Sequence, residues 1–410
     1  MTKARRTFIG LACGVLALGA LAAGCGDDDS GSADTAGTAA STEPIVIGLA
    51  NAQTGFFGYF DVTVSNAVKL AAEQINAAGG VDGRRITTVE SDAKSDPNQS
   101  AAAAIDVIDQ GADVVVTMCD YDLGAPAARE AVKRDKLALA CAGSPLFGSK
   151  GIGPLAFSVN EGTPTQGTVG GEFAVGQGYK TAYLLKDTSN EYTQTWCDAF
   201  EAAFTTANGD GAIVGEDTFV TGDTTVASQV SRLRSSGTRP DVIALCGYPP
   251  TGTTAIKQIR DAGIDTPIVS TAGFDGPGWL DAVPKASEVY AVVSGSIYGD
   301  DPSEAINQFV ADYTAKYGAP SSAYLLYGQA MAESVQLAAQ DAGSSDGPAL
   351  ATAMEGFTDA PLTIGPTTFT PDCHIALGRP MQIVQYQNGK GSWKETVTPA
   401  DVPVPAECAP

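Results

Sequence analysis

Residues 67–86 read AVKLAAEQINAAGGVDGRRI, and the position of the glycines in this stretch decides how the chain folds. Apolar residues recur at helical spacing as far as Ile75, and Gly79, Gly80 and Gly83 follow them. A phosphate-binding loop needs the opposite order, because it follows a strand and opens a helix whose free N–H groups hold the phosphate. We therefore interpret these glycines as a helix C-terminal cap and a turn into a strand.

An alternation of strands and helices extends outward from this stretch. Strands are expected at 45–50, 85–90, 114–118, 137–140, 182–185, 213–219, 242–245 and 267–270. Helices are expected at 62–78, 97–110, after 118 as far as 134, 163–177, 193–207, 225–235 and 254–262. Such an alternation predicts an α/β fold with parallel sheets covered by helices on both faces. Two series in tandem predict two doubly wound lobes.

The pattern changes after residue 290. Helices are expected at 304–317, 324–340 and 348–357 with no strand between them, and strands and turns from 361 onward. Successive helices need a sheet to cover, and we expect them to cover the sheet of the first lobe. The predicted N-terminal lobe is therefore 45–160 plus 290–360, and the predicted C-terminal lobe is 161–289 plus 361–410.

Composition excludes some classes of partner. The chain has 410 residues, 44% of them apolar and 17% charged, which suits a large folded core. Its net charge is −23, and removal of the three positive charges of the N-terminal segment would make it −26. A nucleic-acid partner is not expected, because binding a phosphate backbone requires a basic surface.

The first 25 residues have the layout of a signal peptide, with basic residues at 1–6 and a small, apolar run at 8–23. The ending LAAGC resembles a bacterial lipobox, in which Cys25 receives the lipid. An uncleaved membrane helix is the alternative, since the run nearly reaches the ~20 residues that a span needs. The stretch that begins with Arg5 and Arg6 resembles a twin-arginine export signal, so export by the twin-arginine route and export by the Sec route both remain open. Residues 26–44 lack large apolar side chains, which predicts a disordered tether between a membrane lipid and the folded body.

Six cysteines remain after Cys13 and Cys25 are assigned to the signal segment. An even number in an exported chain predicts disulfides, although six cysteines allow fifteen pairings. A structural metal site is not expected, because His374 is the only histidine and no close CxxC pair occurs. No cofactor is expected.

Six segments together resemble the branched-chain amino-acid-binding proteins, which are type I periplasmic solute receptors of ABC importers. The segments are IVIGLANAQTGFFG (45–58), AVKLAAEQINAAGGVDGRRI (67–86), ESDAKSDPNQSAAAA (90–104), GADVVV (111–116), GYPPTGTTAIKQIRDAGI (247–264) and PSSAYLLYGQAMAES (320–334). The likeness covers about residues 44–400. It implies two Rossmann-like lobes joined by three crossovers, which close on a small solute like a Venus flytrap.

The resemblance also implies a ligand site, and open parallel sheets bind ligands at the same place, the carboxyl ends of their strands. The family's carboxylate-binding loop matches Ala142, Gly143 and Ser144, with Ser144 as a hydroxyl donor. Two tyrosines of the family match Tyr192 and Tyr248.

An aromatic wall is implied near the first strand, formed by Phe57, Tyr59 or Phe60. The family's acidic partner for a ligand ammonium matches Ala272, and the nearest acid is Asp275. That difference weakens the expectation of an ordinary amino-acid ligand.

The family's carboxylate-binding serine matches Asp120 or Tyr121. An ionised Asp120 would repel a bound carboxylate by about 1–4 kcal/mol. The ligand should therefore present hydrogen-bond donors or positive charge there, which leaves amides, polyamines and aromatic acids open.

The fold that the resemblance implies also predicts how the six cysteines pair. Cys119 and Cys141 would both lie at carboxyl ends of strands in one sheet, close enough to bridge beside the site. Cys373 with Cys408 would hold the C-terminal tail, and Cys197 would pair with Cys246.

The leading functional hypothesis is a monomeric, lipid-anchored receptor on the outer face of the cell membrane that delivers a small solute to an ABC permease. A ligand-sensing domain that signals to a membrane partner is the alternative. Enzymatic activity is not expected, because a catalytic triad would have to use His374 and no G-x-S-x-G elbow occurs.

Overall fold

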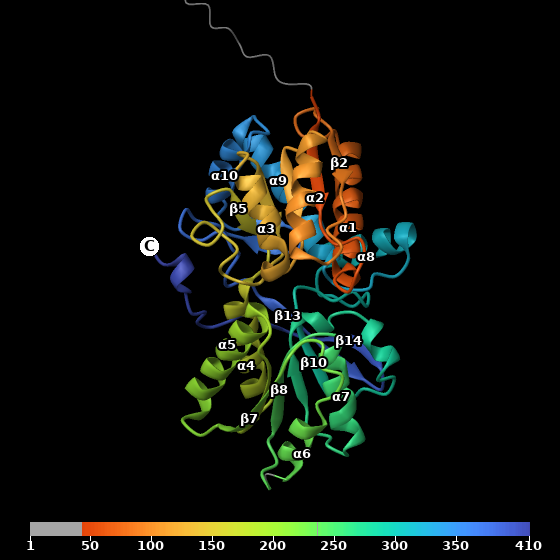
Figure 1. The fold of residues 1–410 in the computed structure, drawn as a ribbon, viewed down its shortest axis with the longest axis vertical. Helices are drawn as coiled ribbons and strands as arrows, with labels where there is room; N and C mark the ends of the chain where they lie inside the picture. Colours follow the sequence, from red (N-terminus) through yellow and green to blue (C-terminus); the bar gives the residue numbers. More distant parts are fainter. Residues whose placement is uncertain (1–42, 236) are drawn as a thin grey trace, which may run out of the picture. The chain divides into compact units, whose positions relative to one another are not determined.

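The computed structural model describes residues 43–235 and 237–410. The expected signal peptide, the lipid attachment site at Cys25 and the tether as far as residue 42 lie outside the described residues. Within the described ranges, none of the helices is both long and apolar enough to cross a membrane. Figure 1 shows two sheets, each accompanied by helices.

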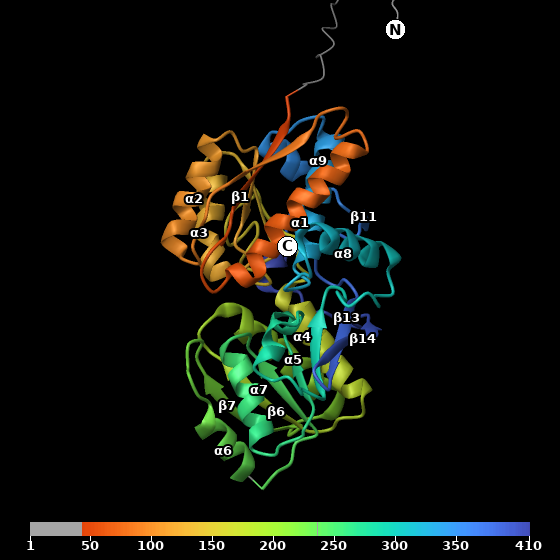
Figure 2. The same ribbon diagram turned by 90° about the vertical axis from the view of Figure 1, so that its right-hand side faces the viewer.

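The first sheet has five strands in the order β2-β1-β3-β4-β5, all parallel. These strands are β1 (Ile45–Ala50), β2 (Ile86–Glu90), β3 (Val114–Thr117), β4 (Leu137–Ala140) and β5 (Ala156–Ser158). Its helices are α1 (Gly58–Ala77), α2 (Pro97–Asp109), α3 (Tyr121–Val132), α9 (Leu325–Ala342) and α10 (Gly347–Glu355). Helices α2 and α3 lie on one side of β1, and α1 and α9 lie on the other (Figure 2). We call this group the first lobe.

The second sheet has seven strands in the order β14-β13-β10-β9-β8-β6-β7. Its parallel strands are β6 (Ala182–Asp187), β7 (Ile213–Phe219), β8 (Val242–Cys246), β9 (Ile268–Ser270) and β10 (Val289–Val293). Strands β13 (Met381–Gln387) and β14 (Lys390–Val397) are antiparallel additions at one edge. The helices that cover it are α4 (Gly162–Gly176), α5 (Glu191–Asn208), α6 (Ala227–Ser235) and α7 (Thr251–Asp261). We call this group the second lobe.

Alternation along the second-sheet strands places their side chains in two separate cores. Leu184 and Ala244 pack with the helices α4 and α5, whereas Leu185 and Leu245 pack with α6 and α7. Successive residues of a strand point to opposite faces, so two covered faces need strands that are apolar throughout. The expected α/β fold with two doubly wound lobes is confirmed.

The interpretation of the opening glycines is confirmed as well. Gly79, Gly80 and Gly83 all have positive φ, and the N–H of Gly80 donates to the carbonyl of Ile75 at 2.9 Å. Helix α1 ends immediately before them, so the glycines close a helix and turn the chain toward β2.

Several element boundaries differ from the expected ones. Helix α1 begins at Gly58, four residues before the predicted start, because the aromatic turn after β1 already continues into the helix. Strands β5 and β10 carry no clear alternation in the sequence, and the sequence pattern predicts neither of them. Both are short and buried on both faces, where period-2 patterning disappears.

Three segments connect the two lobes. They lie between β5 and α4, between β10 and α8 (Glu304–Tyr317), and between β12 (Gly365–Thr367) and β13. Helix α8 and the small hairpin of β11 (Ala360–Leu362) with β12 supply residues to the core of the first lobe, as do Phe369 and Ala376. The residue boundaries that we expect for the lobes stay a prediction.

Candidate functional site

A small cavity lies where strand ends of the two sheets face each other. The residues that line it are Phe57, Phe60, Cys119, Asp120, Tyr121, Gly143, Tyr192, Tyr248, Gly273 and Tyr324. Most of them follow the carboxyl ends of β1, β3, β4, β6, β8 and β9, where doubly wound sheets bind ligands. The cavity measures about 20 Å³, close to the ~10–15 Å³ that one water molecule needs. The rims of the two lobes are therefore nearly in contact.

Local interactions fix the acidic side of this cavity. Asp120 is the N-cap of α3, and its Oδ1 accepts from the N–H of Leu123 at 3.1 Å. The disulfide between Cys119 and Cys141 joins the ends of β3 and β4, with the Cα atoms 4.6 Å apart. The loop that presents Asp120 is thereby held at both of its ends.

Aromatic rings from both lobes fill most of the space. In the first lobe the ring of Phe60 lies 5.1 Å from that of Phe57 and 4.8 Å from that of Tyr324, between centroids. In the second lobe the rings of Tyr192 and Tyr248 lie 6.4 Å apart. Two groups of rings thus face each other across the cavity.

Tyr192 is held in place by a close approach and a hydrogen bond. A Cβ atom on Gly143 would lie 2.9 Å from the Tyr192 ring, so only glycine leaves room for the ring. The Tyr192 hydroxyl donates to Oε1 of Gln166 at 2.9 Å. Burial raises the pKa of Tyr192, and the nearby carboxylate of Asp275 raises it further.

Carboxyl groups near the cavity have raised pKa values. Burial raises the pKa of Asp120 to about 6, and the neighbouring charge of Asp122 adds to the shift. Burial also raises the pKa of Glu191 to about 7 and that of Asp275 to about 8. No lysine or arginine belongs to the described residues that line the cavity.

Four of the predicted ligand residues do not line the cavity. Tyr59 donates its hydroxyl to the carbonyl of Ser321 at 2.5 Å and lines a different surface pocket. The Ala142 carbonyl accepts from Ser158 Oγ at 2.7 Å, and Ser144 Oγ accepts from the N–H of Leu146 at 3.1 Å.

Asp275 is the fourth of these residues, and its Oδ2 accepts from Ser322 Oγ at 2.9 Å. The other six predicted residues do line the cavity: Phe57, Asp120, Tyr121, Gly143, Tyr192 and Tyr248. Their part in binding stays a prediction.

Sequence reasoning missed three residues of this region. Tyr324 belongs to the late helices, and only the crossing of the chain brings it back to Phe60. Gly273 has no side chain that could signal a role, and it packs against Tyr248. Glu191, in the first turn of α5, has the usual position of an acid that favours a helix N-terminus. Only its proximity to Asp122 across the lobes distinguishes it.

The disulfides follow the pairing that the resemblance implied. Besides Cys119 with Cys141, the structure joins Cys197 to Cys246 and Cys373 to Cys408. The second bridge links α5 to β8, and the third holds the C-terminal tail against the segment before β13.

His374 is buried, and its contacts are those of a structural residue. Its ring stacks on Phe157 with centroids 3.8 Å apart, and its Nδ1 and Nε2 contact the Ala156 carbonyl and a carboxylate oxygen of Glu355. Burial lowers its pKa, which favours the neutral ring. Among residues 43–235 and 237–410, no group of three histidine, cysteine or acidic side chains could hold a metal ion.

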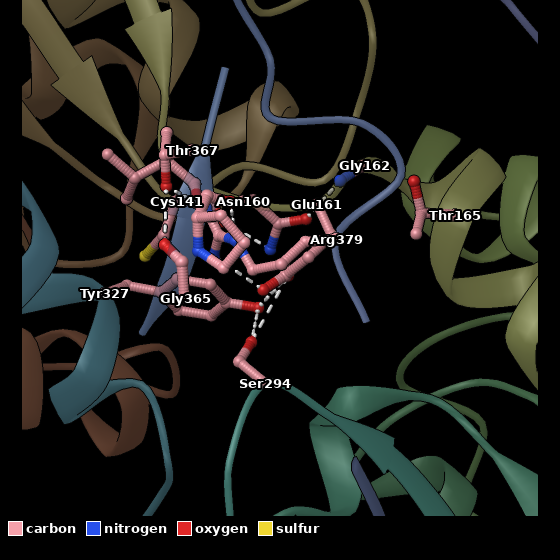
Figure 3. A network of polar contacts seen from close by, with 12 residues as sticks. Cys141, Asn160, Glu161, Gly162, Thr165, Ser294, Tyr327, Gly365, Thr367 and Arg379 are labelled. Carbon is pink, nitrogen blue, oxygen red and sulfur yellow. Dashed lines mark hydrogen bonds and ion pairs between the residues drawn. The ribbon is translucent and has the colours of Figure 1, made fainter. Parts of the chain in front are cut away.

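A buried polar network occupies the connections between the lobes. Glu161, between β5 and α4, pairs with Arg379 from the connection before β13, with Oε1 and Nη1 2.9 Å apart. Oε2 of Glu161 accepts from Tyr327 at 2.8 Å and from Ser294 at 3.2 Å. Figure 3 shows Glu161 between these three partners, which come from three separate parts of the chain.

A second chain of hydrogen bonds starts at Asn160, next to Glu161, and reaches the cavity. Asn160 donates to the Cys141 carbonyl at 3.1 Å and accepts from Gln166 at 2.9 Å (Figure 3 labels Asn160 and Cys141). Gln166 in turn accepts from Tyr192. A continuous chain of hydrogen bonds therefore connects the segment between β5 and α4 to a ring of the candidate site.

Comparison with known proteins places these features in context. The family model described as "Periplasmic binding protein" matches residues 44–391. A Leu/Ile/Val-binding protein, BraC3 of Rhizobium johnstonii, is 24% identical over 335 residues, covering 79% of this chain and 87% of that protein. An amino acid binding protein of Pseudomonas aeruginosa is 26% identical over 310 residues, covering 74% and 80%.

Solved structures have the same fold. The substrate-binding protein LivJ of Streptococcus pneumoniae, in complex with isoleucine, superposes with a TM-score of 0.76 at 24% identity and covers 87% of this chain and 100% of that one. A solute-binding protein of R. palustris in complex with benzoate has a TM-score of 0.72 at 18% identity, with coverages of 88% and 98%.

Proposed function

The chain belongs to the periplasmic binding protein family, and from this premise we propose that it is the solute receptor of an ABC importer. In this proposal it is exported, carries a lipid on Cys25, and captures one small polar solute between its two lobes. The family consists of binding proteins and not of enzymes, in agreement with the prediction from sequence.

The cavity between opposing strand ends is the observation that carries this proposal. Its lining comes from both lobes, with Asp120 and Phe60 on one side and Tyr192 and Tyr248 on the other. A solute in this position touches both sets of residues only when the rims approach each other. Binding would therefore stabilise the closed conformation and shift the population toward it.

The proposed ligand size follows from the relatives. The names of two of them state binding of amino acids, and two solved structures hold isoleucine and benzoate. These are molecules of about ten non-hydrogen atoms or fewer, and a comparable small solute is proposed for this chain. The aromatic rings offer it apolar contact area, and Asp120 offers it a hydrogen-bond acceptor.

Calorimetry on the folded protein tests the proposal. A library of amino acids, amides, amines and aromatic acids should contain one compound with a Kd of about 1 μM, equivalent to about −8 kcal/mol. Tyr192→Ala and Tyr248→Ala should each weaken that binding at least tenfold, whereas Tyr317→Ala, on α8 away from the cavity, should not. If no compound binds, or if binding ignores both cavity substitutions, the proposal is wrong.

The lipid anchor needs a separate experiment. Mass spectrometry of the mature N-terminus from membranes of an expressing bacterium should find a diacylglyceryl group on Cys25. Cys25→Ser should move the protein from the membrane fraction to the soluble fraction or block its processing. An unmodified N-terminus at another residue would refute the anchor and leave the receptor proposal standing.

A further inference from the structure

Carboxylates from both lobes approach each other beside the cavity, which Asp120 lines but Asp122 and Glu191 do not. Asp120 and Asp122 stand at the start of α3 in the first lobe, and Glu191 stands at the start of α5 in the second. The N–H of Glu191 lies 3.4 Å from Oδ2 of Asp122, which brings the two helix starts together. The closed arrangement therefore brings like charges toward each other, which opposes closure unless something neutralises them.

Some of these oxygens are buried without a partner. Oε2 of Glu191 and Oδ1 of Asp275 are both shielded from solvent and have no hydrogen-bond partner in the described part of the chain. Asp275 is only 2% exposed. A buried carboxyl oxygen without a donor is costly, so a ligand donor at the rim would relieve Glu191, whereas Asp275 lies outside the cavity lining.

Among residues 43–235 and 237–410, no salt bridge joins a lysine, arginine or histidine to Asp120, Asp122 or Glu191. Arg379 is committed to Glu161, and Lys257 pairs with Asp261 at 2.5 Å. Arg129, on α3, is exposed and donates to the Tyr121 hydroxyl at 3.2 Å. In the described part of the chain, the charged side chains that raise the pKa of Tyr192 and Tyr248 are all carboxylates.

The aromatic rings complete a site for positive charge. Phe57, Phe60 and Tyr324 lie on one side of the cavity, and Tyr192 and Tyr248 on the other. Ring faces attract ammonium and guanidinium groups, most strongly where water is excluded. A carboxylate on the ligand finds no cation here and meets Asp120 instead.

We infer that the ligand is a small organic cation without a free carboxylate, whose ammonium or guanidinium group lies among these rings and donates to Asp120, on the side of the cavity where Glu191 of the second lobe approaches the start of α3. This inference rests on the proposed function and names the solute class of the same site. The positive group draws the two acidic rims together, so it is the element of the ligand that drives closure. The limited space favours a compact head group.

Matched ligand pairs test the inference by calorimetry at pH 7. The probes are isoamylamine, putrescine and agmatine, with leucine, ornithine and arginine as partners that carry a carboxylate, and isocaproamide as a neutral partner. We expect at least one of the three amines to bind at least 100-fold more tightly than its carboxylate-bearing partner. Its affinity should fall as salt concentration rises.

Two variants and one matched control test whether the carboxylates of Asp120 and Glu191 hold the positive group of the ligand. Asp120→Asn keeps a good N-cap for α3, and Glu191→Gln keeps the side-chain length, so both should fold. Each should weaken binding of the cation at least tenfold. Asp106→Asn, an exposed residue of α2, removes the same charge away from the cavity and should change affinity less than twofold.

The outcomes separate this inference from the proposed function. Tighter binding of an amino acid, the neutral amide or an aromatic acid would overturn the cationic ligand and leave the receptor proposal intact. Binding of Ca²⁺ or Mg²⁺ in place of the amines would also overturn it. If the folded protein binds none of these compounds, both the inference and the receptor proposal fail.

Discussion

Glu161 and Arg379 form a buried ion pair at the point where the connections between the two lobes meet. Glu161 is fully buried and Arg379 is 3% exposed, and their nearest charged atoms lie 2.9 Å apart. Arg379 also donates from Nη2 to the Val159 carbonyl and to Thr367 Oγ1 at 2.8 Å. Because Glu161, Arg379 and Ser294 each belong to a different one of the three connections, their contacts join all three connections at one point.

Removing one member of this pair should destabilise the protein strongly. Arg379→Met leaves the Glu161 carboxylate buried without a cation, and we expect a loss of about 3–5 kcal/mol in the free energy of unfolding by urea. The double variant Glu161→Gln with Arg379→Met should recover part of this loss, because no unpaired charge remains. Arg232→Met breaks an ion pair with Asp217 that solvent reaches, and it serves as the control with little effect. An Arg379→Met variant as stable as the control would contradict the role of the pair.

The buried acids make stability depend on pH. In the folded protein burial raises the pKa of Asp275 to about 8, whereas an unfolded aspartate titrates near 4. A carboxyl with a raised pKa stabilises the fold at low pH, and this contribution is lost as pH rises through about 8. We expect the free energy of unfolding to fall as pH rises from 5 to about 8 and to level off toward pH 9. The slope is up to ~1.4 kcal/mol per pH unit for each such group, over the range where the folded protein keeps a proton that the unfolded chain has lost.

Asp275→Asn provides the control for this pH dependence. Asparagine keeps the hydrogen bond with Ser322 and does not titrate, so the slope between pH 5 and pH 9 should become shallower. Asp61 should retain its share of the slope, because burial raises its pKa to about 8 as well. Equal slopes in both proteins, measured by urea unfolding at five pH values, would exclude Asp275 as a source.

Close helix packing in the first lobe depends on a glycine. A Cβ on Gly328 of α9 would lie 2.5 Å from the carbonyl oxygen of Val64 on α1. Gly328→Ala should therefore force the two helices apart and cost about 1–3 kcal/mol. Gly176, at the end of α4, has open space around it, and Gly176→Ala should be neutral or stabilising by up to ~1 kcal/mol. Thermal unfolding of both variants measures the difference, and equal melting temperatures would refute the packing argument.

The fold could be predicted from the sequence because local patterns determined it. The position of Gly79 after a helical segment, and the apolar runs at β3 and β8, identify parallel sheets without any knowledge of distant contacts. Strand β10 escaped prediction, since its five residues are all buried and have neither alternation nor helical spacing.

The candidate site could be predicted only where it follows strand ends. Asp120 follows β3 of the first sheet, and Tyr192 and Tyr248 follow β6 and β8 of the second, so topology places each at the carboxyl edge of its own sheet. Tyr324 and Glu191 depend on how the chain crosses between lobes and how closely the rims approach, and no local pattern encodes either. Likewise, no sequence signal pairs Glu161 with Arg379, which are 218 residues apart.

The disulfide beside the cavity should affect binding as well as stability. Cys119 and Cys141 join the ends of β3 and β4, and Asp120 follows Cys119 directly. Replacing both cysteines by alanine should cost about 2–4 kcal/mol in the free energy of unfolding and loosen the loop that presents Asp120. Ligand affinity should therefore fall, chiefly through faster dissociation.

Removal of the bridge between Cys373 and Cys408 is the matched control for that prediction. Its loop is of similar length, with a sequence separation of 35 between the two cysteines compared with 22, so the loss of stability should be comparable. It holds the C-terminal tail and contributes no residue to the cavity, so affinity should stay within twofold. Peptide mapping of the native protein without reductant must first recover the Cys119–Cys141 fragment. A Cys119–Cys373 fragment would contradict the assignment, and equal loss of affinity in both double variants would show that the bridge beside the cavity has no special role in binding.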